Sequence, residues 1–393
     1  MHVLESYALQ NNLKIDKAEV YERFFPLAVD KYITIDTSSL KTPAMSYSHW
    51  QIVIDLIKDK LKELNISIIQ LGEKECKPLT DCYLAIGQCN FNQKAYVIKN
   101  SVAHISTNNE TCHLASVYNK KSVVLFPNNC YPEQFLPYWT SEENLEVLAP
   151  ESDDKPSFNP AENPKSIDKI RPEDVASKIL KFAGVHTFVP EYKTLKIGSS
   201  FYRPRIESAL SSLVDVTKLG VNSLIVRMDL NFNESNLIKQ LEATPCSIIT
   251  NKAIDEKIIE KYHSKILEMV YYLTDDHDLN FVKKIKSKSI NYILRTRAKG
   301  ETYNDLKLSY FDYGMISQIK EKSKDDFEEL KNKNKLYYKS KQFIIHNNSF
   351  YPCSAALVRG KQGSRSMEHD IVEAIDDPLF WEEEEHFHFF EKK

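Results

Sequence analysis

Glycine is scarce in this chain of 393 residues, which contains only nine. Neither G-x-G-x-x-G nor G-x-x-x-x-G-K-[ST] occurs, which excludes a glycine-rich phosphate loop of the usual kind. The net charge of −3 gives no overall positive field of the kind that favours nucleic-acid binding. No apolar run approaches the roughly 20 residues that a membrane-spanning helix needs.

Cysteine pairs at C-x-x-C spacing are also missing, although the chain has seven cysteines. An odd number of cysteines without a signal peptide predicts reduced thiols. Residues Met1–Glu5 lack the basic segment and the long apolar segment of a secretory signal. We therefore expect a cytoplasmic protein with no integral membrane segment.

The composition that remains is globular, with 42% hydrophobic and 27% charged residues. A chain of this length exceeds one ordinary domain. In its first part, short apolar runs typical of strands alternate with segments whose apolar residues recur at helical spacing. The apolar runs are Tyr32–Asp36, Ile66–Leu71 and Ser122–Phe126, and the segment Trp50–Leu64 has helical spacing. This alternation predicts an α/β fold with a parallel sheet covered on both faces.

Five prolines between Leu148 and Pro172, among Asp, Ser and Asn, are typical of a linker. A second alternating series follows, which predicts a second α/β domain, and the chain becomes rich in charge beyond residue 302. There we expect an amphipathic helix at Ile316–Leu336 and a hairpin around Asn347-Asn348. The expected division is a first Rossmann-like domain at 1–147, a linker at 148–172, a second α/β domain at 173–302 and an α-rich, charged extension at 303–393. The five strand-like runs of the second series are Thr194–Ile197, Ser223–Met228, Cys246–Thr250, Ile266–Leu273 and Ile290–Leu294.

Residues Asn108 to Ala115 read Asn-Asn-Glu-Thr-Cys-His-Leu-Ala, and an apolar run ending in Phe126-Pro127 follows them. This string resembles the donor-binding half of family 9 glycosyltransferases, the heptosyltransferase-like enzymes of GT-B fold, whose turn usually reads D-[ST]-G-x-x-H-L-A. The resemblance covers about residues 30–183. It implies two Rossmann-like domains, the first of which binds a nucleotide-sugar.

The resemblance also implies a reaction. A hexosyl or heptosyl group would pass from a nucleotide-sugar to a hydroxyl of a glycan or other acceptor, seated between the domains, without a metal and without a further cofactor. Lys41 would stabilise the leaving nucleoside diphosphate, and Asp229 of the second domain would act as the base. Amides at a helix N-terminus would hold the diphosphate. The implied donor-binding residues are Thr37, Lys41, Glu75, Asn108, Asn109, Glu110, Thr111 and His113.

The turn departs from the family pattern, because Asn108, Asn109 and Glu110 stand where the family has Asp, Ser or Thr, and Gly. A desolvated carboxylate beside a diphosphate would repel it by several kcal/mol (order of magnitude) unless a lysine or metal intervenes. The domain order is also unusual, since the donor-binding half is C-terminal in the family. The alternative is a catalytically degenerate, glycosyltransferase-like module that binds or has a structural role.

Two strand-end segments in the second half offer other chemistry. Ser199, Ser200, Arg203 and Arg205 suit phosphate or carboxylate recognition in an acceptor site, or else form a surface turn whose arginines pair with Glu207 or the acidic tail. The pair Asp276 and Asp278 has the spacing with which GT-A enzymes hold a divalent metal, but aspartates also favour turns and helix caps.

Two segments near the C-terminus remain. The basic, tyrosine-containing run Lys331–Lys341 could contact a nucleic acid, but a solvated helix end explains it better. His386 and His388 follow an acidic run and lie among aromatic residues, which indicates an amphipathic segment docked on the body rather than a metal site.

Overall fold

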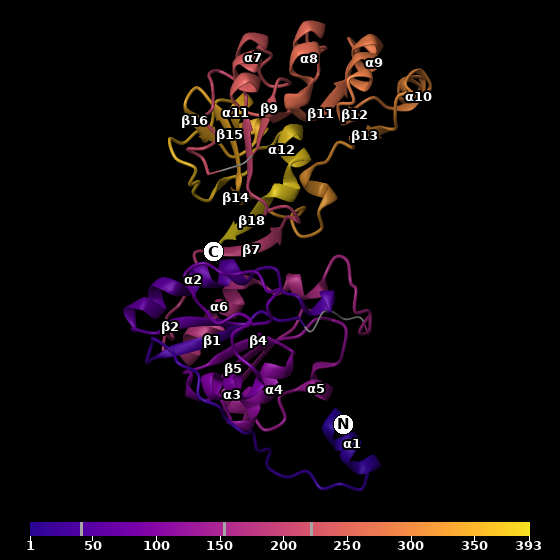
Figure 1. Ribbon diagram of the computed structural model, residues 1–393. Coiled ribbons are helices and arrows are strands. Elements are labelled where there is room, and N and C mark those ends of the chain that lie inside the picture. The colour runs from indigo at the N-terminus through magenta and orange to yellow at the C-terminus, as the bar shows by residue number, and fades with distance from the viewer. Residues whose placement is uncertain (40–41, 152–154, 221–222) are drawn as a thin grey trace. The chain divides into compact units, whose positions relative to one another are not determined.

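The computed structural model describes residues 1–39, 42–151, 155–220 and 223–393. Lys41 and residues 152–154 of the proline-rich seam therefore lie outside the described residues. The chain forms two units, Met1–Glu191 and Tyr192–Lys393, each of which is described by itself (Figure 1).

A parallel sheet organises unit 1, with the spatial strand order β3-β2-β1-β4-β5-β6. Every strand pairs in parallel with its neighbours. The order runs outward in both directions from β1 and β4, as in the doubly wound Rossmann fold. The strands are β1 (Tyr32–Asp36), β2 (Ser67–Leu71), β3 (Tyr83–Leu84), β4 (His104–Thr107), β5 (Ser122–Leu125) and β6 (Leu145–Leu148).

Helices cover both faces of this sheet, which confirms the prediction from the alternating pattern. Helices α2 (Trp50–Glu63) and α6 (Pro172–Phe182) pack on one face. Helices α3 (Phe91–Asn100) and α4 (Glu110–Val117) pack on the other. Two short helices, α1 (Val3–Gln10) and α5 (Pro132–Phe135), complete the unit.

Unit 2 contains an eight-stranded sheet of order β13-β12-β11-β10-β9-β8-β15-β16, which is parallel except for the hairpin strand β16. Helices α7 (Glu234–Ala243), α8 (Glu256–Tyr262), α9 (Leu279–Ser287) and α10 (Gly300–Ser309) connect β9 to β13 and pack together on one face (Figure 1). The strands are β8 (Arg205–Ser208), β9 (Leu224–Arg227), β10 (Cys246–Thr250), β11 (Ile266–Leu273), β12 (Tyr292–Thr296), β13 (Ile316–Gln318), β15 (Gln342–His346) and β16 (Ser349–Tyr351).

The C-terminal region is mostly antiparallel sheet, so the prediction of an α-rich extension is wrong. Strands β17 (Val372–Glu373), β14 (Tyr337–Ser340), β18 (Phe387–Lys392) and β7 (Tyr192–Ile197) pair in that order. Two short helices, α11 (Ser354–Val358) and α12 (Pro378–Glu382), pack in the same region. The run Thr194–Ile197 therefore belongs to this small sheet and not to the parallel one.

The predicted helix at Ile316–Leu336 is also wrong. Ile316 packs in the core of the large sheet, whereas Leu330 and Leu336 pack in the core of the small sheet, and one helix could not serve both. The predicted hairpin is confirmed, because β15 and β16 pair around Asn347 and Asn348, which both have positive φ.

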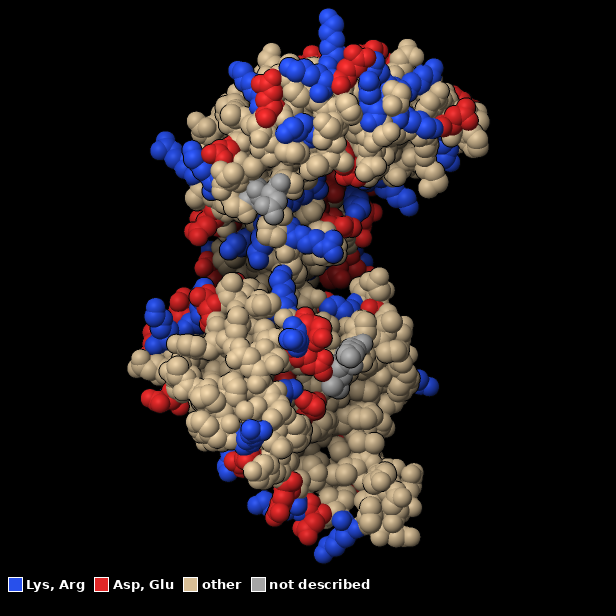
Figure 2. Space-filling view, in the orientation of Figure 1, with Lys and Arg blue, Asp and Glu red and all other residues tan. Residues whose placement is uncertain are grey.

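Lysines and arginines are interspersed with acidic side chains on the visible surface, most densely over the outer helices α7 to α10 (Figure 2). This mixture agrees with the small net charge. Among the described residues no helix is both long and apolar enough to cross a membrane.

Candidate functional site

The strand order of unit 1 marks one edge of its sheet as the expected ligand site. In an open parallel sheet, ligands bind at the carboxyl ends of the strands where the order reverses. In this unit that point lies between β1 and β4. The turn after β1 begins with Thr37 and Ser38, and the turn after β4 contains Asn108 and Asn109. The family-like string therefore lies at the edge that the fold favours for a ligand.

Asp36, the last residue of β1, carries a buried oxygen without a partner. Its side chain is 0% exposed, and its Oδ1 accepts hydrogen bonds from the backbone N (2.8 Å) and the hydroxyl (2.5 Å) of Ser38. Within the described part of the chain, its Oδ2 and the hydroxyl of Ser106 have no hydrogen-bond partner. Asp36 and Ser106 are register partners on β1 and β4. Such unsatisfied buried groups are costly, so a donor is expected to reach this point.

A buried histidine connects β1, β4 and α4. His104 Nδ1 lies 2.9 Å from the hydroxyl of Thr34, and its Nε2 lies 3.0 Å from the hydroxyl of Thr111. Because Thr111 donates its own hydroxyl proton to Asn109 Oδ1 (2.8 Å), the network favours a proton on Nε2 of His104. Burial lowers the pKa of His104 to about 4, so the ring is neutral near pH 7.

Asn109 caps helix α4 with its own side chain. Its Oδ1 accepts from the backbone amides of Thr111 (3.0 Å) and Cys112 (3.4 Å), and its Nδ2 donates to the carbonyl of Ser38 (3.2 Å). Two of the first amides of α4 are therefore already satisfied. A diphosphate could reach them only by displacing the Asn109 side chain.

Glu110, the first residue of α4, forms an ion pair with Lys94 of α3 at 2.7 Å. The Lys94 side chain is 9% exposed and that of Glu110 is 46% exposed. Burial alone would lower the pKa of Lys94, but the hydrogen bond to Glu110 and the charge of Asp36 raise it above its ordinary value. Lys94 therefore offsets the negative charge of Glu110 at this turn.

The other predicted donor-binding residues are dispersed around the same edge. The Thr37 hydroxyl accepts from Gln70 Nε2 (3.0 Å), and Asn108 is buried, with its Oδ1 3.8 Å from Cys112 Sγ. Glu75 is exposed in the turn after β2. Burial lowers the pKa of His113, which lies on α4. Lys41 lies outside the described residues.

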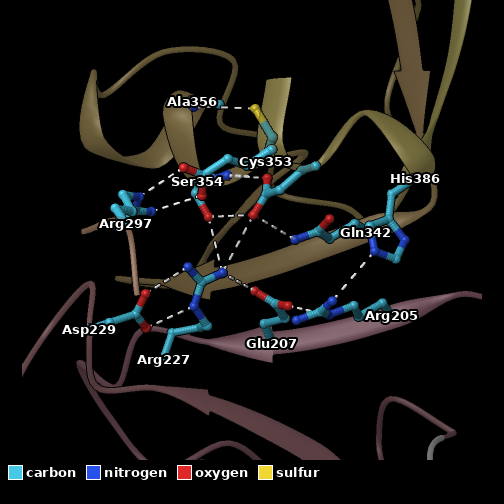
Figure 3. A network of polar contacts seen from close by, with 12 residues as sticks. Arg205, Glu207, Arg227, Asp229, Arg297, Gln342, Cys353, Ser354, Ala356 and His386 are labelled. Atoms are coloured by element: carbon cyan, nitrogen blue, oxygen red, sulfur yellow. Dashed lines mark hydrogen bonds and ion pairs between the residues drawn. The ribbon is translucent and has the colours of Figure 1, made fainter. Parts of the chain in front are cut away.

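Asp229, the predicted base, lies in unit 2 just after β9. Its two oxygens accept from Nε and Nη2 of Arg227, both at 2.8 Å (Figure 3). Arg227 also donates to Glu207 (2.6 Å) and to the hydroxyl of Ser354 (3.0 Å). Because both carboxylate oxygens are engaged by a guanidinium, a substrate hydroxyl can reach Asp229 only if this pair opens.

The segment that contains Ser199, Ser200, Arg203 and Arg205 contacts the acidic tail. Arg205 forms an ion pair with Glu207 (Figure 3), and its Nη1 lies 3.4 Å from His386 Nε2. The backbone N of Ser200 donates to the carbonyl of Glu385 (2.8 Å) and the hydroxyl of Ser199 lies 3.5 Å from that residue's carboxylate. Arg203 is exposed. These contacts match the surface-turn alternative, and β8 rather than a helix follows Pro204.

The remaining motifs take structural roles. Asp278 caps α9, because its side chain accepts from the backbone N of Asn280 (2.8 Å). This helix cap is the role that the sequence offered as the alternative to metal binding. Across the described ranges, no group of three or more His, Cys, Asp and Glu side chains is arranged to hold a metal. Part of Lys331–Lys341 forms β14, and His388 lies buried in β18.

Two residues of the unit 1 edge escaped prediction. Asp36 ends a recognisable strand, but its burial depends on strands and helices far along the chain. Lys94 offered a weak signal: it is the one charged residue among the buried positions of α3, four residues before Ile98.

No family model and no curated protein sequence matches this chain. Solved structures of glycosyltransferases show a distant likeness. Heptosyltransferase II of Escherichia coli shares 14% identity over 45% of this chain and 50% of its own, with a TM-score of 0.31. A family 9 glycosyltransferase of Veillonella parvula shares 14% identity over 39% and 46%, with a TM-score of 0.32. The iron-containing heptosyltransferase TibC of E. coli, solved in complex with ADP-D-β-D-heptose, shares 11% identity over 44% and 51%, with a TM-score of 0.33.

The chain thus spans about half the length of the structures that it resembles. At these scores the likeness carries no argument about activity. The function proposed below therefore rests on the residues and the sheet order.

Proposed function

We propose that this chain is a glycosyltransferase whose unit 1 binds the nucleotide part of a nucleotide-sugar at the carboxyl ends of β1 and β4. The observation that carries the proposal is the coincidence of two features. The strand order reverses between β1 and β4, and the string that resembles the family 9 donor turn follows β4.

Asp36 supplies the specific contact in this proposal. Because the Asp36 side chain is 0% exposed, its unpartnered Oδ2 accepts a hydrogen bond from a hydroxyl of the bound nucleotide through one water, or directly once the turn at Ser38 opens. Thr37 and Asn108 border the same edge and offer further polar groups. Lys94 keeps the charge at Glu110 from opposing a diphosphate.

In the proposed reaction, the acceptor hydroxyl loses its proton to a base and its oxygen forms a bond to the anomeric carbon. The bond from that carbon to the diphosphate breaks, and the nucleoside diphosphate leaves with the electron pair. Lys41 and Asp229 remain the proposed leaving-group and base residues, with Asp229 first released from Arg227. The acceptor is a glycan or another hydroxyl-bearing molecule.

Calorimetric titration of the full chain with ADP, UDP and GDP tests nucleotide binding. At least one should bind, and Asp36→Asn, which keeps the shape and the Oδ1 contacts, should weaken it by roughly tenfold through loss of a charged acceptor. Asp59→Asn, an exposed position on α2, is the matched control and should leave the affinity unchanged. Absence of binding across the panel would contradict the proposal.

A second candidate, the catalytically degenerate binding module, is favoured by two contacts: the capping of α4 by Asn109 and the engagement of Asp229 by Arg227. The two candidates differ in turnover. An active enzyme slowly releases nucleoside diphosphate from the nucleotide-sugar that it binds even when water is the acceptor, whereas the degenerate module binds the nucleotide and releases none.

A further inference from the structure

One face of the large sheet in unit 2 carries no helices of the crossover series. The connections from β9 through β13 advance in a single direction across the sheet. Successive right-handed crossovers in one direction put all their helices on the same face, and α7 to α10 do pack together there. Alternate residues of the strands therefore point to the opposite face, among them Arg227, Ile249, Tyr272 and Arg295.

That opposite face is hollowed into a cavity of about 640 Å³, formed entirely within unit 2. Its sheet residues include an apolar row, Ile225, Ile249 and Val270, and its walls include Leu379 of α12 and the segment that follows β13. The volume and the combination of an apolar floor with a few polar groups are typical of a pocket for a small molecule.

The charges at the β8 and β9 end of this cavity are satisfied by one another. The buried Arg227 bridges Glu207 and Asp229 and lies 3.5 Å from Glu383 (Figure 3). Glu383 in turn accepts from the backbone N (2.9 Å) and hydroxyl (2.6 Å) of Ser354. This end therefore stabilises the fold and offers no free charge to a ligand.

The β12 and β13 end differs. Arg295 is half-buried beside Tyr272, its register partner on β11, and among the described residues the side chains of Arg295 and Lys320 make no hydrogen bond or ion pair. By contrast, Arg297, two residues further on, is held by Glu382 through two hydrogen bonds of 2.8 Å. A half-buried guanidinium above an apolar floor gains most from an anion that completes its hydrogen bonds.

The carboxylates of the cavity leave this end positive. Glu382 accepts from Arg297, Glu383 accepts from Ser354, and Glu385 lies at the Ser199 turn. Glu268 is exposed on β11, ahead of Val270 and Tyr272, and the register partner of Arg295 is Tyr272. The local excess of positive charge is thus carried by Arg295 and Lys320.

We propose that this cavity binds a small organic anion. Its phosphate or carboxylate group is held by Arg295 and Lys320, and its apolar body lies over Ile249 and Val270. The site lies within unit 2 and is distinct from the nucleotide site proposed in unit 1, although Asp229, the proposed base, also lines the cavity.

Calorimetric titration of the full chain with phenyl phosphate and with benzoate tests the proposal, and the tighter of the two identifies the preferred anionic group. For probes of this size we expect dissociation constants of about a millimolar. Arg295→Gln should weaken the tighter probe by roughly tenfold, and Lys320→Gln by less, because Lys320 is exposed. Arg365→Gln, an exposed arginine of unit 2 that does not line the cavity, is the matched control.

The variants are suited to the test because, among the described residues, neither substitution removes a side-chain hydrogen bond or ion pair, and circular dichroism verifies that each variant is folded. Three results would overturn the proposal: no saturable binding of either anion, equal affinity of the folded Arg295→Gln variant and the unmodified chain, or binding of uncharged phenol as tight as that of phenyl phosphate.

Discussion

Lys94 determines how Glu110 acts at the turn between β4 and α4. From the sequence, a glutamate in the place of the family's glycine is expected to repel a diphosphate. The ion pair with Lys94 offsets most of that repulsion, because the lysine comes from another helix and is buried against the turn. Breaking the pair should cost stability as well as change the local charge.

We predict that Glu110→Gln lowers the free energy of unfolding by about 1 kcal/mol, since it leaves the ammonium of Lys94 desolvated without a counter-charge. The loss is limited because Glu110 is 46% exposed and solvent screens the pair. Lys94→Met in the Glu110→Gln background should restore part of the loss. Urea denaturation of the two single variants and the double variant measures the coupling.

The exposed pair Lys60–Glu63 on α2 is the matched control, because its members are 50% and 62% exposed. Glu63→Gln should change stability by less than about 0.5 kcal/mol. An equal effect of Glu110→Gln and Glu63→Gln would show that Lys94 does not depend on its partner.

Elements whose apolar pattern is local were predictable, and elements that depend on distant partners were not. The runs Tyr32–Asp36 and Ile266–Leu273 became strands of parallel sheets, and the apolar residues that made them recognisable pack in the cores beneath the helices of their units. The small sheet pairs β7 with β18, which lie almost two hundred residues apart. No short window of sequence contains that pairing, so the tail was recognised as a docked aromatic segment but not as a strand.

The same limit applies to the candidate site. The turn after β4 was predicted from its own residues, and it lies where the strand order reverses, the edge at which open parallel sheets favour ligands. Its role in binding stays a prediction. The occupation of the α4 amides by Asn109 is a side-chain rotamer choice that spacing does not reveal. The contribution of Lys94 depends on the packing of α3 against α4.

His104 of β4 contacts Thr34 of β1 and Thr111 of α4. It should make the stability of unit 1 sensitive to acid. Its pKa in the folded chain is about 4, below the ordinary value of 6.5, so on acidification the unfolded chain takes up the proton first. The stability from the neutral ring is fully present above about pH 6.5 and is lost as the pH falls toward 4. The shift corresponds to about 3 kcal/mol over that interval.

We predict that His104→Gln flattens the fall in stability between pH 6.5 and 4, because the amide can keep a contact with Thr34 or Thr111 but does not titrate. Urea denaturation at several pH values measures the slope. His263→Gln, at an exposed position of unit 2, should keep the slope of the unmodified chain. Equal slopes for His104→Gln and the unmodified chain would mean that other groups, such as the half-buried His113, cause the acid sensitivity.

At the scale of the whole molecule, each unit has its own sheets and its own apolar cores. In unit 2 the first strand, β7, pairs with the last strand, β18. Strand β18 also pairs with β14, so it lies in the interior of the small sheet. Its aromatic residues Phe387 and Phe389 are 0% exposed and pack against Phe380 and Trp381.

We predict that a chain ending at His386 loses the native structure of unit 2 and keeps that of unit 1. Removal of Phe387 and Phe389 alone forfeits about 3–6 kcal/mol of apolar burial, a large part of the stability of a typical domain, and leaves β7 and β14 without the strand between them. Limited proteolysis should then yield a resistant fragment close to residues 1–191, with the remainder digested. A chain ending at Phe390 removes only the partly exposed end of the same strand and should resist digestion as the full chain does. If both truncated chains were digested alike, the segment Phe387–Phe390 would not be what stabilises unit 2. If unit 1 were lost together with unit 2, the two units could not be independent in stability, because the sheet that contains β18 has no strand in unit 1.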